Sequence, residues 1–197
     1  MLDESTMKEY IDKMGNLSED VVILVAEDKD PDFLLITKRV RLGGITNKII
    51  RLANGRKALD FLFMKGRGAK RERNVKYLLL LDLNISKVEG IEILRKIKDH
   101  KELSLIPVIV LTARHSVCQM NTCHKLGCHA YMLKPVDDIF VKAVYTLSQS
   151  ISSQQSPVLP FHLRSLINKS LDDTLSDTLS DTLSDTSDDS QFSLQSI

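Results

Sequence analysis

Five short apolar runs, each followed by a stretch of helical period, constrain the fold of this 197-residue chain more than any other feature. Three of the runs, VVILV, LLLL and VIVL, are apolar without alternation, which is typical of strands covered on both faces. Strands that alternate with helices form a parallel sheet with helices packed on it. We therefore predict an α/β fold with a doubly wound, five-stranded parallel sheet. The expected strands are 21–26, 48–53, 77–83, 107–112 and 129–134.

Helix signals lie between and after these strands. Asp30 is the expected N-cap of the first helix, with Pro31 as its first residue, and the pair Gly43–Gly44 is expected to end it. Gly127 follows the fourth helical stretch in the same way. The expected helices are 31–42, 54–64, 89–98, 116–126 and 137–150.

Composition divides the chain into three parts. Residues 1–20 are read as an N-terminal extension and residues 21–151 as the domain. Residues 152–197 are read as a low-complexity acidic tail, in which 173–184 is three copies of DTLS. A polar repeat of this kind cannot offset the entropy of ordering, so we expect a disordered C-terminal tail. Within it, only residues 161–171 have a helix-like spacing of apolar side chains.

Charge and cysteine content narrow the class of protein. No apolar run approaches the roughly 20 residues of a membrane-spanning helix, and the polar N-terminus does not resemble a signal peptide. Three cysteines, all within 118–128, make a poor disulfide framework and are read as thiols, so we expect a cytoplasmic protein. Residues 1–150 hold 25 Lys and Arg against 19 Asp and Glu, whereas residues 151–197 hold two against seven.

The expected strands end in a distinctive set of side chains. Glu27 and Asp28 follow the first strand, Asp82 ends the third, Thr112 the fourth and Lys134 the fifth. The carboxyl ends of parallel strands meet at one edge of the sheet, where α/β proteins place their sites. Three carboxylates brought together there would repel each other unless a cation lay among them, and Mg²⁺ is the most suitable hard divalent ion.

This constellation can accept a phosphoryl group. A metal ion and the Lys134 ammonium on either side of Asp82 would stabilise the negative charge of a phosphoryl group that its carboxylate attacks. The Thr112 hydroxyl could then donate to a phosphoryl oxygen.

The segments VVILVAEDKDPDFLLI, LLLLDLNISKVEGIEILRKIK, PVIVLTA and AYMLKP resemble the receiver family of two-component response regulators. The resemblance covers about residues 20–150 and implies a flavodoxin-like fold. Its spacings also match, with 30 residues from Asp82 to Thr112, 22 from Thr112 to Lys134 and eight from Asp82 to Gly90. The LDLN pattern, the ALDFL helix and the basic insertion before the third strand are most similar to single-domain regulators associated with phytochromes.

The resemblance implies a metal site and a donor. Asp82 would be phosphorylated by a sensor histidine kinase, which the resemblance to phytochrome-associated regulators indicates to be phytochrome-like, or by a phosphotransfer protein. Asp28 and Asp82 would bind Mg²⁺ directly, Glu27 would act through a metal-bound water, and the backbone carbonyl of Asn84 would complete the protein ligands.

The resemblance also implies a switch. Thr112 would follow the phosphoryl group inward, Lys134 would pair with it, and Tyr131 would rotate as the threonine moves. There are departures from the family pattern. Ser86 stands where proline is frequent, which we expect to loosen its loop, and Arg114, with Asn84, occupies a position that tunes phosphoryl lifetime.

The expected function is signalling through protein contacts that depend on phosphorylation. The expected partners are a downstream protein target and a second copy of the chain in a possible homodimer, and the protein is not expected to be an enzyme.

The basic loop 65–76 lacks the aromatic residues of many nucleic-acid sites, and no helix-turn-helix follows, so no direct DNA binding is expected. We expect that loop to be solvated and to help dock an acidic kinase face. A receiver-fold interaction module that acts independently of phosphorylation is the alternative. A flavin carrier is disfavoured, because Glu27 and Asp28 would repel the cofactor phosphate.

A cluster of histidines and cysteines near residue 120 suggests zinc at first sight. The cysteines are separated by five and five residues, unlike the close pairs of structural zinc sites. We therefore expect packing roles for the cluster, which comprises His115, Cys118, Cys123, His124, Cys128 and His129.

Overall fold

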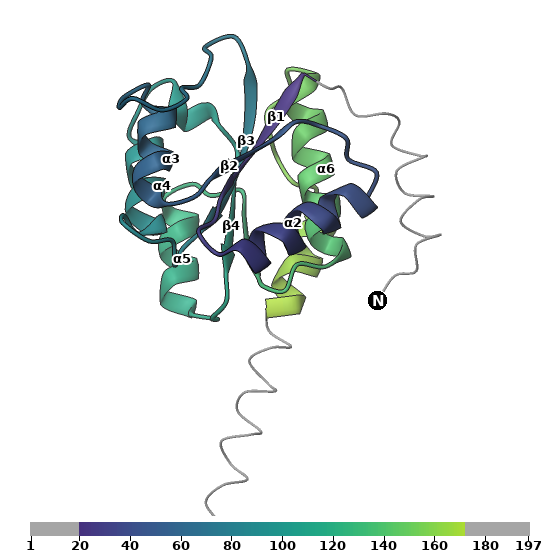
Figure 1. Cartoon of the computed structure of the whole chain (residues 1–197). Coiled ribbons are helices and arrows are strands. Elements are labelled where there is room, and N and C mark those ends of the chain that lie inside the picture. The colour runs from purple at the N-terminus through teal and green to yellow at the C-terminus, as the bar shows by residue number, and fades with distance from the viewer. Residues whose placement is uncertain (1–19, 172–197) are drawn as a thin grey trace, which may run out of the picture.

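A parallel sheet in the order β2-β1-β3-β4-β5 organises the chain (Figure 1). The structure is a computed structural model, and it describes residues 20–171. Neighbouring strands pair in parallel throughout, which confirms the predicted doubly wound, flavodoxin-like sheet. The strands are β1 (Val21–Ala26), β2 (Ile49–Leu52), β3 (Lys76–Asp82), β4 (Val108–Thr112) and β5 (Ala130–Leu133).

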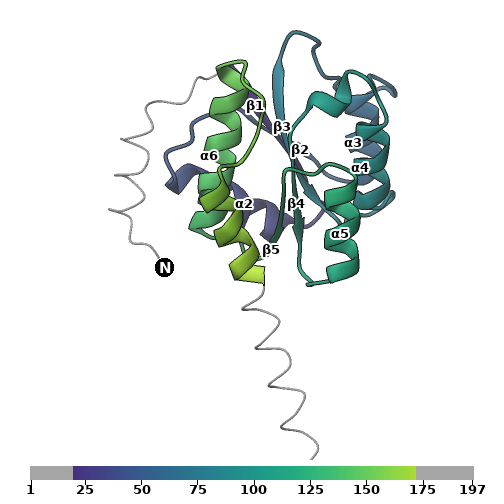
Figure 2. The ribbon, with the colours of Figure 1, turned by 180° about the vertical axis from the view of Figure 1, so that it is seen from behind.

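Helices cover both faces of this sheet. In Figures 1 and 2, α3, α4 and α5 lie on one side and α2 and α6 on the other. No helix among the described residues is both long and apolar enough to span a membrane. The helices are α2 (Asp30–Leu42), α3 (Gly55–Leu62), α4 (Gly90–Lys98), the 3₁₀ turn η1 (Leu103–Leu105), α5 (Val117–Lys125) and α6 (Asp138–Ser152).

Side-chain caps fix where three of these helices begin. Asn54, Ser116 and Asp137 each accept a hydrogen bond from a backbone N–H of the first turn that follows. The predicted cap of α2 was wrong by one position. Lys29 is the N-cap and makes no side-chain cap bond, while Asp30 is the first helical residue, where its charge suits the positive end of the helix.

The central strands carry the core and align the site. Leu78 to Leu81 of β3 are all fully buried, as expected for a strand covered on both faces. Ala26 pairs with Leu81 across the β1–β3 ladder. Glu27 and Asp82, which come next in their strands, therefore lie side by side at the same end of the sheet.

The predicted tail boundary needs correction. Residues 161–171 form a helix, and the four aliphatic side chains at 159, 163, 167 and 171 are at most 5% exposed. The expectation of disorder from residue 152 is thus wrong for this segment, because a repeat of one aliphatic residue every fourth position gives the helix one apolar face to bury. The DTLS repeats and residues 1–19 lie outside the described residues.

Most of the basic loop 65–76 is exposed, as expected, but one of its cations is not. The Arg71 side chain is buried, donates to the Leu62 carbonyl at 2.7 Å and pairs with Glu102 at 2.7 Å. One cation of the loop therefore has a structural role. The remaining expectation, docking to a kinase, stays a prediction.

Candidate functional site

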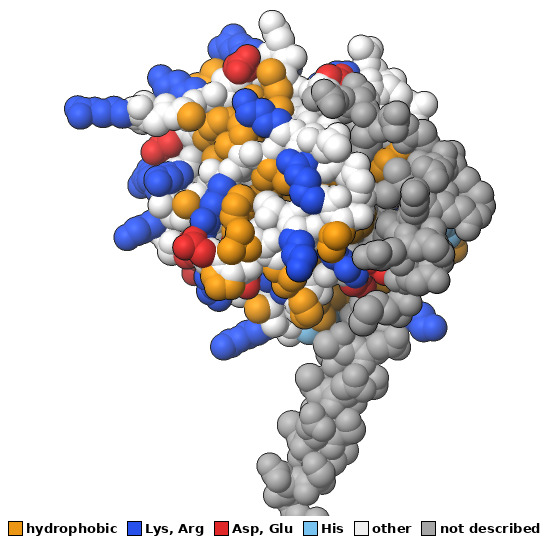
Figure 3. All heavy atoms as spheres, turned by 45° about the vertical axis from the view of Figure 1, so that its right-hand side comes forward, with side chains coloured by type: hydrophobic (Ala, Val, Ile, Leu, Met, Phe, Trp, Pro, Cys, Tyr) orange, Lys and Arg blue, Asp and Glu red, His pale blue; other side chains and the backbone are white. Residues whose placement is uncertain are grey.

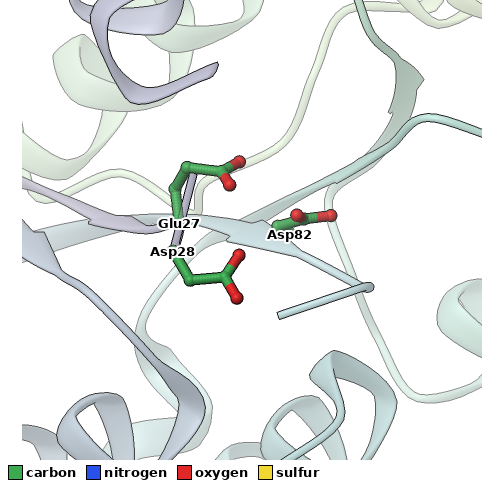
Figure 4. Close-up of side chains that lie close together, drawn as sticks. All are labelled: Glu27, Asp28 and Asp82. Atoms are coloured by element: carbon green, nitrogen blue, oxygen red, sulfur yellow. The ribbon is translucent and has the colours of Figure 1, made fainter. Parts of the chain in front are cut away.

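Three carboxylates meet at the carboxyl ends of β1 and β3. One ligand oxygen from each of Glu27, Asp28 and Asp82 lies within 4.8 Å of the others. The side chains extend to the same side of the strand ends (Figure 4). Glu27 is fully buried and Asp82 is 2% exposed. Within residues 20–171 this is the only group of three or more His, Cys, Asp or Glu residues arranged so that it could hold a metal ion.

Lys134 brings positive charge to this cluster from the end of β5. Its ammonium lies 3.1 Å from Asp82 and 2.9 Å from Asp32, and it makes a short hydrogen bond to Glu27. Burial by itself would lower the pKa of Lys134, but the hydrogen bonds to Glu27 and Asp32 and the charge of Asp82 outweigh burial and raise it. Lys134 is therefore a fixed cation, and four carboxylates with one ammonium leave the site negative overall.

Glu27 and Asp28 differ in their environments. Burial raises the pKa of Glu27, although Lys134 and the Lys29 N–H act to lower it. Burial also acts to raise the pKa of Asp28, but hydrogen bonds from Ser86 outweigh it and the pKa falls below its usual value. Asp28 is thus the more readily ionised of the two acids.

An unpartnered oxygen on Asp28 indicates where a cation fits. Its Oδ2 accepts the backbone N–H of Ser86 at 3.1 Å, whereas its Oδ1 is buried without a hydrogen-bond partner in the structure. Buried carboxylate oxygens are normally paired with a donor or a metal ion. Hard divalent cations such as Mg²⁺ prefer this oxygen-rich donor set, so the residues present fit such an ion.

Ser86 is more than a departure from a sequence pattern. Because its backbone N–H reaches Asp28, the residue supplies a donor that proline at this position could not supply. The loop that follows Asp82 is thereby tied to the loop that follows β1. This observation differs from the expectation of a loosened loop.

The loop after β3 folds back closely against the end of that strand. The Asn84 N–H donates to Asp82 Oδ1 at 3.1 Å. A Cβ on Gly90 would come within 2.5 Å of the Asp82 carbonyl oxygen and 2.6 Å of the Leu83 Cα. Glycine is therefore required at position 90, which explains the fixed spacing from the aspartate. The predicted role of the Asn84 carbonyl as a ligand stays a prediction.

Thr112 and Tyr131 lie on neighbouring strands behind the carboxylates. Thr112 is 1% exposed and its hydroxyl donates to the Arg114 carbonyl at 3.2 Å. Tyr131, in register with Val110 of β4, is fully buried, and burial raises its pKa. The register places the two residues two positions apart on the paired strands β4 and β5, and their switching roles remain predictions.

Two residues of the site were not anticipated from the sequence. Asp32, in the first turn of α2, pairs with Lys134, and its position four residues after Asp28 was the available signal. Arg51 of β2 donates to the carbonyls of Glu27 and Asp28 at 3.0 and 2.9 Å. No local pattern identifies Arg51, because its contacts depend on the pairing of β1 with β2.

The histidine and cysteine cluster does not assemble into a metal site within the described residues. Cys128 Sγ lies 3.7 Å from His124 Nδ1. Burial raises the pKa of Cys123 to about 11 and that of Cys128 to about 12, so both groups stay protonated thiols near neutral pH.

Comparison with known proteins gives this geometry its context. Residues 23–144 match the response regulator receiver domain. The response regulator Rcp1 of Synechocystis sp. is 33% identical over 132 residues, which are 67% of this chain and 86% of Rcp1. The Mn²⁺-bound form of Rcp1 is similar in structure, with 30% identity and a TM-score of 0.52, and the match covers 71% of this chain and 96% of that one.

A further solved structure, the phosphorylated cyanobacterial phytochrome response regulator RcpA, has 26% identity and a TM-score of 0.54. The match covers 68% of this chain and 94% of RcpA. These relatives confirm the predicted similarity to phytochrome-associated regulators. The chain belongs to the receiver domain family of response regulators, the signalling proteins of two-component systems.

Proposed function

We propose that the protein takes a phosphoryl group onto Asp82 from the phosphohistidine of a sensor histidine kinase or phosphotransfer protein and then signals through altered protein contacts. The observation that carries the proposal is the placement of Asp82. Its buried carboxylate lies beside Glu27 and Asp28 and 3.1 Å from the Lys134 ammonium. A nucleophilic carboxylate between a cation site and an ammonium group is what phosphoryl transfer requires.

In the proposed transfer, an oxygen of Asp82 forms a bond to phosphorus as the bond between phosphorus and the histidine nitrogen breaks. Asp28, Asp82 and, through water, Glu27 would hold Mg²⁺, with the Asn84 carbonyl as a further ligand. The ion would supply positive charge to the phosphoryl oxygens. Lys134, now shared among carboxylates, would pair with a phosphoryl oxygen, and the Thr112 hydroxyl would donate to another.

The chemical change is then converted into a change of surface. Thr112 must leave its bond to the Arg114 carbonyl in order to reach the phosphoryl group. The space near Thr112 would change, and Tyr131 would shift between two packed positions. In this role the protein is a switch and not an enzyme, with intrinsic dephosphorylation at most.

The proposed phosphoryl donor is suggested by the relatives of this chain. RcpA is a phytochrome response regulator, so we propose a phytochrome-like kinase as donor. Lys and Arg side chains stand out over the face in Figure 3, and residues 20–171 hold 25 of them against 14 Asp and Glu. A positive surface would attract an acidic kinase face in the cytoplasm. A downstream protein target, a possible homodimer and the lack of direct DNA binding remain predictions.

Acetyl phosphate with Mg²⁺ tests the proposal directly. Intact-mass spectrometry is expected to show one added phosphoryl group on the wild-type protein and none on Asp82→Asn. The exposed Asp99, which lies in a different part of the domain at the end of α4, is the matched control, and Asp99→Asn is expected to be labelled normally. Equal labelling of Asp82→Asn and wild type would show that another residue is the acceptor.

A further inference from the structure

The helix at residues 161–171 lies next to β5, the edge strand of the sheet (Figure 2). Aliphatic side chains recur at every fourth position from 159 to 171, namely Leu159, Leu163, Ile167 and Leu171. All four are between 1% and 5% exposed. In contrast, Phe161 is 87% exposed and Leu166 is 42% exposed. The segment therefore docks through one narrow aliphatic face.

The contact extends along the whole of β5. At one end, His129 and Tyr131 share the lining of a 480 Å³ cleft with Leu159, Arg164 and Ile167. The Arg164 guanidinium is close enough to His129 to affect its protonation. The helix thus lies over the strand that carries the predicted switch residue.

At the other end, the helix reaches the lysine of the acid cluster. Leu133, Lys134 and Pro135 line a second cleft, of 210 Å³, together with Ile167 and Leu171. Ile167 lines both clefts, so the contact between the helix and the domain is not packed continuously. Each cleft removes packing contacts that a tightly fitted helix would make.

We propose that the helix 161–171 is a self-bound ligand of the surface over β5, and that phosphorylation of Asp82 releases it so that the surface can take an aliphatic helix from a partner protein. The release step rests on the function proposed above. The occupant in the resting state is visible in the structure, and its sequence defines the chemistry of the surface: a helix with a Leu or Ile at every fourth position.

The direction of the effect follows from Lys134. Its ammonium is now shared by Glu27, Asp32 and Asp82, and Lys134 also lines the cleft that Leu171 lines from the helix. Recruitment of the ammonium to a phosphoryl oxygen moves that wall of the cleft. An 11-residue helix is only marginally stable in water without tertiary contacts. Loss of its packing contacts with the domain therefore also unfolds it.

Hydrogen–deuterium exchange on the full-length protein tests the release. With Mg²⁺ and acetyl phosphate, amides of residues 161–171 are expected to exchange at least fivefold faster than with Mg²⁺ alone, and Asp82→Asn is expected to show no change. Intact mass of the same samples reports whether Asp82 is phosphorylated. Unchanged exchange in a phosphorylated sample overturns the release step, whereas an unphosphorylated sample counts against the proposed function.

A second arm tests the surface without any phosphorylation. The double variant Leu163→Glu/Ile167→Glu is expected to exchange rapidly at 161–171 and to bind a fluorescent peptide of residues 156–171. The matched variant His162→Glu/Ser165→Glu changes exposed positions of the same helix and is expected to exchange as wild type does. It is expected to bind the peptide at least tenfold more weakly than the Leu163→Glu/Ile167→Glu variant does. Slow exchange in the first variant, or no binding of the peptide to it, overturns the proposal.

Discussion

The acid cluster at the strand ends and the aliphatic contact over β5 are held together by opposite kinds of interaction. In the cluster, buried like charges repel and one ammonium compensates them. Over β5, four aliphatic side chains are removed from water. The first region is stabilised by pairing and is sensitive to ions and protons. The second is stabilised by buried area and is sensitive to the size of its side chains.

Lys134 belongs to both regions, since its ammonium lies among the carboxylates and the residue lines a cleft together with Ile167 and Leu171 of the C-terminal helix. The comparison therefore shows how a fold can join a charged site to an apolar surface through one residue. The predictions below separate the two kinds of stabilisation.

The largest effect is expected at Lys134. Replacement by Met leaves the buried carboxylates of Glu27 and Asp82 without their ammonium partner, which should lower the free energy of unfolding by about 3–5 kcal/mol without a divalent cation. Added Mg²⁺ should restore part of the loss. The exposed pair Lys96–Glu92 supplies the control, and Lys96→Met is expected to cost less than about 0.5 kcal/mol. Urea unfolding that gives similar losses for the two variants would contradict charge compensation as the stabilising term.

Acidification should affect the contact over β5 through His129. Burial, with Lys98 and Arg164 nearby, lowers the pKa of His129 from 6.5 to about 4. The unfolded chain then binds more protons between these values, so stability is full above pH 6.5 and falls as the pH drops toward 4. The loss is at most about 3.5 kcal/mol.

His129→Gln should flatten this dependence, because the variant has no group to titrate there. The exposed His162→Gln is the control and should keep the wild-type slope. Free energies of unfolding measured at several pH values between 4 and 7 would decide the matter. The same slope in His129→Gln and wild type would assign the pH dependence to the carboxylates instead.

Truncation should distinguish two leucines of the same helix. Leu163 is 1% exposed and Leu166 is 42% exposed. Leu163→Ala is expected to cost about 2 kcal/mol, the lower end for a buried aliphatic side chain, because the helix can detach from the domain. Leu166→Ala should cost less than about 0.5 kcal/mol. Equal melting temperatures for the two variants would show that buried area does not hold the helix.

The smallest effect is expected from metal binding. Mg²⁺ at ten times its dissociation constant should raise the free energy of unfolding by about 1.4 kcal/mol. Asp28→Asn removes a carboxylate with an unpartnered buried oxygen and should abolish this gain. Asp99→Asn, at an exposed carboxylate after α4, should retain it. Thermal unfolding at increasing Mg²⁺ measures both, and an equal gain in Asp28→Asn would place the ion elsewhere.

The strand pattern and the end residues were predictable because they depend on local sequence. The unbroken LLLL run indicates a strand buried on both faces, and Asp82 follows it directly. Parallel pairing then brings Glu27 and Asp28 to the same edge. The sequence showed that Asp32 lies four residues after Asp28, but its pairing with Lys134 depends on where the first turn of α2 lies relative to the end of β5, which no local pattern shows.

The C-terminal helix is a second feature that the sequence predicted only in part. Its helix-like spacing at residues 161–171 was recognised, but the composition around it favoured disorder. Composition indicates only whether a segment has, on average, enough apolar residues to offset the conformational entropy lost on ordering. It does not reveal that one face of a short helix meets an open edge strand.

The sequence by itself determined the α/β alternation, the parallel sheet and the set of acidic, hydroxyl and lysine side chains at the strand ends, because periodicity and strand termini are local properties of the chain. Only the tertiary structure decided how charge is shared around Lys134, which oxygen of Asp28 lacks a partner and where residues 161–171 dock. Those features depend on distances between segments that lie far apart in the chain, and only the packing of the whole domain sets these distances.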